Sequence, residues 1–191
     1  MSERTRLIDA SVFITLAEID ALDSLESLEG ALIVPSAVRR EVSSEPAKAQ
    51  LERLVAAGTI SETDWFQWSE KRGIPGERVA AATHLGTNPD AAVDTIDGQQ
   101  VLVDGDVALL SLARSMEDVV VVSDDKPLRK TCKSQSIPVS GCIAVLVHAV
   151  ESGQYTPKKA KEKLYAMDEV GARLSASLVK RAERLIDDAS D

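Results

Sequence analysis

The segment that most clearly indicates the fold class is Val119-Val120-Val121-Val122-Ser123-Asp124-Asp125. Its four β-branched residues form a run too short for a buried helix, and they predict a strand that is apolar on both faces. Pro127 follows at a position that the first turn of a helix tolerates, and Leu128 to Lys133 continues that helix. A fully apolar strand followed by a helix is typical of a parallel sheet covered on both sides.

The same order of strand and helix recurs on both sides of this stretch. Arg4 to Ile8 predicts a strand that leads into a helix over Ala10 to Leu28, and Ala31 to Val34 predicts a second strand before a helix that contains Val38. The fold class is therefore α/β. A further helix runs through Leu51, Leu54 and Val55 until Gly58. The remaining predicted elements are helices at 77–84, 107–116, 142–150, 157–167 and 174–188, an edge strand beginning at 59–60, and a last strand at 137–139.

The length of 191 residues predicts one domain with appendages. We assign residues 1–150 to a main domain, interrupted by an excursion at about 65–104 that Gly and Pro break up, and residues 151–191 to a C-terminal helical extension packed on the same domain. No run approaches the roughly 20 apolar residues of a membrane span, and the polar start does not resemble a signal peptide. We therefore expect a soluble, cytoplasmic protein.

Composition narrows the possible chemistry. There are 31 Asp and Glu against 22 Lys and Arg, a net charge of −9, which excludes a generally basic nucleic-acid coat protein. Cys132 and Cys142 are the only cysteines and form no CxxC motif, so they predict neither a disulfide scaffold nor a four-ligand zinc site. Aromatic residues are 3% of the chain, which leaves little for stacking on bases, so nucleic-acid contacts must depend on charge, metal or backbone groups.

Acidic side chains follow the predicted strands, at the edge where ligands bind in parallel sheets. Carboxylates crowded at one edge repel one another unless cations neutralise them, so the pattern indicates a metal site. Oxygen ligands without paired His or Cys favour Mg²⁺ or Mn²⁺, and these ions in turn indicate hydrolysis of a phosphodiester. The acids that can converge there are Asp9, Glu41, Asp104, Asp106, Asp124 and Asp125.

Each acid also has a structural interpretation. Asp9 and Asp106 stand where an acid caps a helix, and Glu41 alone is typical of a solvated helix residue. One acid suffices to cap the helix after the valine strand, so at least one of Asp124 and Asp125 is predicted to be catalytic.

Four motifs in order resemble the PIN domain: Leu-Ile-Asp9-Ala-Ser, Val-Pro35 through Val38 to Glu41, Gly105-Asp106 before an apolar helix, and Val-Ser123-Asp124-Asp125-Lys126. The resemblance covers nearly the whole chain except 65–104. It implies a three-layer α/β/α fold with a short, mostly parallel sheet and an Mg²⁺- or Mn²⁺-dependent endoribonuclease that acts on RNA. Many members are VapC-type toxins, which implies a possible antitoxin partner.

The resemblance also implies roles for individual residues. Ser123 would orient a carboxylate or a water and contribute to substrate binding. Because the gap between Glu41 and Asp106 is long, Glu45 and Asp104 are the substitutes for them. The catalytic set is Asp9, Glu41, Asp106, Asp124 and Asp125, with Asp9, Asp106 and Asp125 as metal ligands.

Charge is uneven along the chain. Residues 126–184 carry 12 bases and 5 acids, whereas residues 1–100 carry 9 bases and 17 acids. Lys126, Arg129 and Lys130 follow the acid pair directly and are predicted to hold RNA phosphates. We also expect a homodimer, formed through the apolar stripe of Leu25 and Leu28 or through the excursion.

Two other functions compete with a ribonuclease. The first is a catalytically weak PIN-like scaffold that binds RNA or protein, against which the complete set of acids argues. The second is a phosphatase or a phosphate-receiving signalling domain. Such receivers place an acid pair at the first strand, whereas here Asp9 stands alone and the pair of Asp124 and Asp125 comes late.

Overall fold

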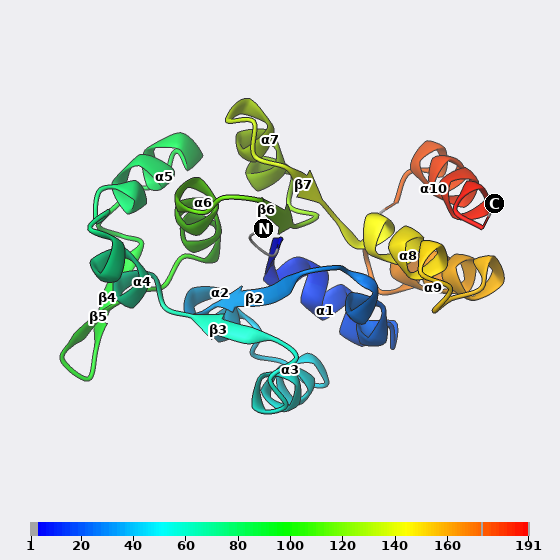
Figure 1. The fold of residues 1–191 in the computed structure, drawn as a ribbon, viewed down its shortest axis with the longest axis horizontal. Coiled ribbons are helices and arrows are strands. Elements are labelled where there is room, and N and C mark those ends of the chain that lie inside the picture. Colours follow the sequence, from blue (N-terminus) through cyan, green and yellow to red (C-terminus); the bar gives the residue numbers. More distant parts are fainter. Residues whose placement is uncertain (1–3, 173, 191) are drawn as a thin grey trace.

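The computed structural model describes residues 4–172 and 174–190. Its centre is a parallel sheet of five short strands in the order β3-β2-β1-β6-β7 (Figure 1). Strand β1 pairs with β2 on one side and with β6 on the other, so that Ile8 lies opposite Val122. This arrangement confirms the predicted α/β class and the short parallel sheet. The strands are β1 (Thr5–Ile8), β2 (Ala31–Pro35), β3 (Ser61–Thr63), β6 (Val119–Val122) and β7 (Val139–Ser140).

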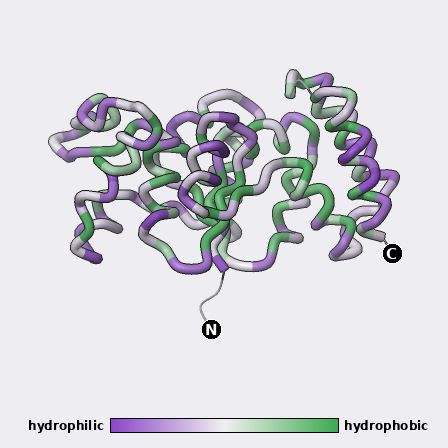
Figure 2. The backbone as a smooth tube through the Cα atoms, turned by 90° about the horizontal axis from the view of Figure 1, so that it is seen from above, coloured by the Kyte–Doolittle hydropathy of each residue, from purple (hydrophilic) through white to green (hydrophobic). Residues whose placement is uncertain are grey.

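Helices cover both faces of this sheet and complete three α/β/α layers. Helix α1 (Ala10–Glu18) lies with α3 (Ala47–Ala56) and α8 (Cys142–Glu151) in one layer. Helix α6 (Gly105–Ser115) contacts α2 (Ser36–Glu41) and α7 (Lys126–Ser134) in the other. Figure 2 shows hydrophobic segments gathered in the middle of the molecule and hydrophilic ones along its outer loops.

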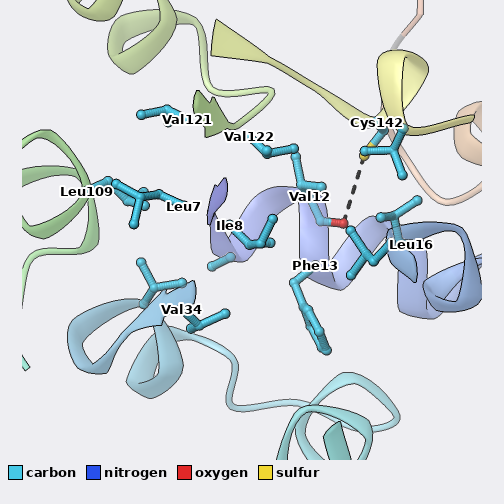
Figure 3. Packing of buried hydrophobic residues seen from close by; sticks show 14 of the residues in the cluster. Leu7, Ile8, Val12, Phe13, Leu16, Val34, Leu109, Val121, Val122 and Cys142 are labelled. Carbon is cyan, nitrogen blue, oxygen red and sulfur yellow. Dashed lines mark hydrogen bonds between the residues drawn. The ribbon is translucent and has the colours of Figure 1, made fainter. Parts of the chain in front are cut away.

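The core lies between the central strands and the two helical layers. Leu7, Ile8, Val121 and Val122 have no exposed surface, and Figure 3 shows Leu7 beside Leu109 of α6 and Val122 beside Val12 of α1. The two cysteines belong to the same cluster. Both are fully buried and pack there as small hydrophobic residues.

The helix predicted over residues 10–28 is shorter than expected. Helix α1 ends at Glu18, because Asp20 adopts a positive φ of 52°, and a 3-10 helix, η1 (Leu22–Ser27), follows. Leu25 and Leu28 are 1% and 6% exposed, packed in the chain's own core. The prediction that they form a dimer surface is therefore wrong.

The excursion folds into two helices and a hairpin. Helix α4 (Trp65–Arg72) precedes α5 (Glu77–Leu85), which confirms the short helix predicted at 77–84, and β4 (Val93–Ile96) pairs antiparallel with β5 (Gln99–Leu102). Trp68 Nε1 donates to Ser115 Oγ at 3.0 Å, so this tryptophan holds the excursion to α6.

Two helices follow α8 at the end of the chain. Helix α9 (Pro157–Glu169) packs on α8, and α10 (Ala176–Asp188) packs on both. Figure 1 shows these helices at the end of the molecule opposite to α4 and α5. Among the described residues, no helix combines the length and the apolar character that crossing a membrane requires.

Candidate active site

A cleft of about 560 Å³ lies beyond the carboxyl ends of β1, β2 and β6. Five carboxylates line it, and they come from segments far apart in the sequence. The parallel sheet places Asp9 and Asp125 at this edge after β1 and β6, and the end of α2 and the start of α6 add the other three acids. The lining residues are Asp9, Ala10, Ser11, Glu41, Ala91, Val103, Asp104, Asp106 and Asp125.

Asp9 is the most buried of these acids, at 4% exposed. Its backbone N–H donates to the Val122 carbonyl at 3.0 Å, which extends the pairing of β1 with β6 into the site. Although Asp9 precedes α1, its side chain makes no capping hydrogen bond. Its Oδ2 instead accepts from Ser11 Oγ at 2.5 Å and from Ser123 Oγ at 2.7 Å. The interpretation of Asp9 as a helix cap is therefore wrong.

Ser123 joins two of the acids from beneath the cleft. Besides donating to Asp9, its Oγ accepts from the backbone N–H of Asp125 at 3.0 Å. The side chain has no exposed surface, so a bound substrate does not reach it. This corrects the prediction that Ser123 contributes to substrate binding and leaves it the role of orienting a carboxylate.

Glu41 reaches the cleft from the end of α2. Its Oε1 accepts from the backbone N–H of Gly105 at 2.8 Å, and a Cβ at Gly105 would lie only 2.5 Å from the same oxygen. Desolvation of the carboxylate raises the pKa of Glu41 above its ordinary value. The substitute Glu45 does not line the cleft, because its Oε2 accepts from Ala49 N–H in the first turn of α3.

The two acids at the start of α6 have different roles. Asp104 is the N-cap, and its Oδ1 accepts from Val107 N–H at 2.9 Å. The capping role considered for Asp106 therefore belongs to Asp104. Within the described part of the chain, no hydrogen bond or ion pair holds the Asp106 carboxylate. Desolvation, followed by repulsion from Asp9, Asp125, Asp104 and Glu41, raises the pKa of Asp106 to about 7.

The two acids after β6 bind the N-terminal ends of two different helices. Asp125 lines the cleft and also caps α7, where its Oδ1 accepts from Leu128 N–H at 2.7 Å. Asp124 lies outside the cleft, and its Oδ2 accepts from the N–H of Cys142, the first residue of α8, at 3.1 Å. Asp125 alone caps α7, as inferred from the sequence, but Asp124 has a separate structural partner at the start of α8, so its presence does not require a catalytic role. Asp124 is therefore corrected from a catalytic to a capping residue.

The basic residues after the acid pair also separate. Arg129 Nη1 donates to the carbonyls of Ser123 at 2.6 Å and Ser140 at 2.5 Å, tying the end of β6 to the end of β7. This corrects the prediction that Arg129 holds phosphates, because its guanidinium positions the backbone beneath Asp9. Lys126 and Lys130 are exposed and make no ion pair with the described residues.

The residues of the cleft fit a hard divalent cation. All the acidic side chains offer oxygen ligands, and desolvation, followed by repulsion from neighbouring acids, raises the pKa values of Asp106 and Glu41. Among residues 4–172 and 174–190, no three His, Cys, Asp or Glu side chains already meet around one point. Mg²⁺ does not require such a cage, because it keeps several waters and binds through one or two carboxylates.

Ser11 is the functional side chain that sequence reasoning missed. It donates to Asp9 from the first turn of α1. The signal was present as a hydroxyl two residues after the acid, but only the turn of the backbone into α1 brings the two side chains together.

Comparison with known families matches residues 5–188 to the PIN domain. The chain therefore belongs to the PIN-domain family, whose members are generally nucleases and typically use divalent metals. None of the curated proteins matches the chain.

Proposed function

We propose that this chain is an Mg²⁺- or Mn²⁺-dependent endoribonuclease in which Asp9, Glu41, Asp106 and Asp125 supply the metal ligands, with one or two of these carboxylates on each ion. The observation that carries this proposal is the Asp9 carboxylate, which is 4% exposed, caps no helix and lines the same cleft as Asp106. Crowded, desolvated acids destabilise a fold, and such perturbed groups cluster at functional sites.

The residues of the cleft act mainly by orientation. Ser11 and Ser123 fix Asp9, while the N–H of Gly105 fixes Glu41. In the metal-free cleft desolvation and the neighbouring acids raise the pKa of Asp106 to about 7, and a bound divalent cation would keep this carboxylate ionised as a ligand. A bound divalent ion supplies charge for the phosphoryl oxygens and activates a water.

Substrate binding requires positive charge, because the cleft is acidic. Lys126 and Lys130 are exposed near the start of α7, immediately after the cleft residue Asp125. These two lysines bind the phosphates that flank the scissile bond. Because such contacts release counterions, the affinity for RNA falls as the salt concentration rises.

Cleavage of a mixed RNA pool by wild type, Asp9→Asn and Asp124→Asn tests the assignment. Both variants remove one negative charge, but only Asp9 lines the cleft, so Asp9→Asn should abolish Mg²⁺-dependent cleavage and Asp124→Asn should retain it. Calorimetric titration with Mn²⁺ gives a second readout, in which only Asp9→Asn weakens binding. Metal-independent cleavage, or equal loss in both variants, contradicts the proposal. Metal-independent RNA binding without cleavage in wild type supports the scaffold instead.

A toxin of a toxin–antitoxin pair is the more specific form of this proposal. Production of the wild type in a bacterial host should then arrest growth, whereas Asp9→Asn should not. A small reading frame immediately upstream whose product relieves the arrest would identify the antitoxin. Growth unaffected by an active enzyme indicates a role in RNA processing.

A further inference from the structure

A second groove, of about 570 Å³, lies between α8, α10 and the segment from α7 to β7. It shares no lining residue with the acidic cleft. Figure 1 shows α8 and α10 as neighbours at the C-terminal end of the molecule. Apolar side chains line much of it, namely Val139, Ile143, Val147, Leu178 and Leu185.

Two leucines of α10 make this groove unlike an ordinary surface. Leu178 and Leu185 are 40% and 42% exposed, and both are among the most exposed large hydrophobic residues of the described chain. They stand seven positions apart, so they lie on the same face of the helix two turns from each other. Exposed apolar residues gathered on one face mark a surface that another molecule covers.

The unpaired charge around the groove is positive. In residues 4–172 and 174–190, Lys126, Lys133 and Arg181 form no ion pair and no side-chain hydrogen bond. The acids of the groove are fewer than its bases: Asp124 accepts from the α8 backbone, and Glu151 Oε2 lies 2.7 Å from His148 Nδ1.

Neither a second copy nor RNA fits this surface well. In a two-fold pairing through α10, Leu178 of one copy would face Leu185 of the other, and the Arg181 side chains between them would face each other. RNA would bring phosphates to the basic side chains of the groove but would leave the exposed Leu178 and Leu185 without an apolar partner.

We propose that this groove binds an acidic amphipathic helix of a partner protein. Apolar residues at positions i, i+4 and i+7 of that helix cover Leu178, Leu185 and Ile143, as in other complexes of a helix with a groove. Its Asp and Glu residues face Lys133 and Arg181, which supplies specificity through complementary charge.

Fluorescence anisotropy with two labelled peptides tests this proposal. Both have about 16 residues, or roughly four helical turns, and the same leucine stripe; one carries Glu at its polar positions and the other Lys. Only the Glu peptide should bind saturably. Arg181→Glu should weaken that binding at least about tenfold. Arg184→Glu makes the same charge change on the same helix outside the groove and should leave binding unchanged. Thermal melting confirms that both variants fold.

Four results would overturn the proposal. They are absence of saturable binding by the Glu peptide, equal binding of the Lys peptide, equal effects of Arg181→Glu and Arg184→Glu, and binding that survives Leu185→Ser. Light scattering that shows a dimer lost in Leu185→Ser would assign the groove to a second copy. Displacement of the Glu peptide by an RNA oligomer would assign it to RNA.

Discussion

Replacing Asp106 with Asn should stabilise the metal-free protein at neutral pH. The pKa of Asp106 rises from 3.8 to about 7 on folding, because desolvation and the neighbouring acids disfavour its charged form. Between these two pH values the folded state binds more protons than the unfolded state, so the free energy of unfolding falls as pH rises. Because Asn carries no charge at these pH values, Asp106→Asn removes this fall in the free energy of unfolding.

The magnitude follows from the shift. About 3 pKa units at roughly 1.4 kcal/mol each set a ceiling of about 4 kcal/mol. Asp106 borders an open cleft, and solvent screens much of that repulsion, which leaves about 1–2 kcal/mol. A gain of that size raises the melting temperature of a chain of this length by about 2–8 °C.

Thermal unfolding monitored by circular dichroism measures the effect, in chelator at pH 7.5 and again near pH 4.5. The gain of Asp106→Asn should be present at the higher pH and largely lost at the lower one. Asp124→Asn is the matched control. It weakens the acceptor for the Cys142 N–H and should destabilise the protein by about 1 kcal/mol at pH 7.5. A lower melting temperature for Asp106→Asn at pH 7.5 would refute the view that repulsion dominates at this position.

Four further results are expected. Gly105→Ala should displace Glu41 and weaken Mn²⁺ binding in calorimetry, since the new Cβ would lie 2.5 Å from Glu41 Oε1; unchanged affinity excludes Glu41 as a ligand. Ser123→Ala should lose about 1–3 kcal/mol of unfolding free energy and most cleavage, and Ser123→Thr should restore part of both; equal stability of Ala and wild type would contradict the buried role. Changing Lys126 and Lys130 to Ala should weaken RNA binding and reduce the salt slope by about 1.4, while an unchanged slope shows that neither contacts phosphate. Light scattering should report a homodimer formed through the excursion, and a monomer at micromolar concentration removes that expectation.

The parallel sheet, and the presence of acids at the edge where its strands end, could be predicted from the sequence alone. Four valines form a strand wherever they can be covered on both faces, and parallel strands must end at one edge. The sequence alone therefore predicts that Asp9 and Asp125 lie near each other.

Which of these acids line the cleft depends on tertiary contacts that the local sequence does not show. Successive side chains of an extended backbone point to opposite sides, so one residue of the pair after β6 faces the cleft and the other faces α8. The choice of Asp125 over Asp124 depends on α8, which begins 17 residues after Asp125 and presents the N–H of Cys142 to Asp124. The burial of Ser123 and the contacts of Arg129 with two backbone carbonyls also depend on residues distant in sequence. The local sequence around a serine or an arginine is the same whether its side chain binds substrate or the protein backbone.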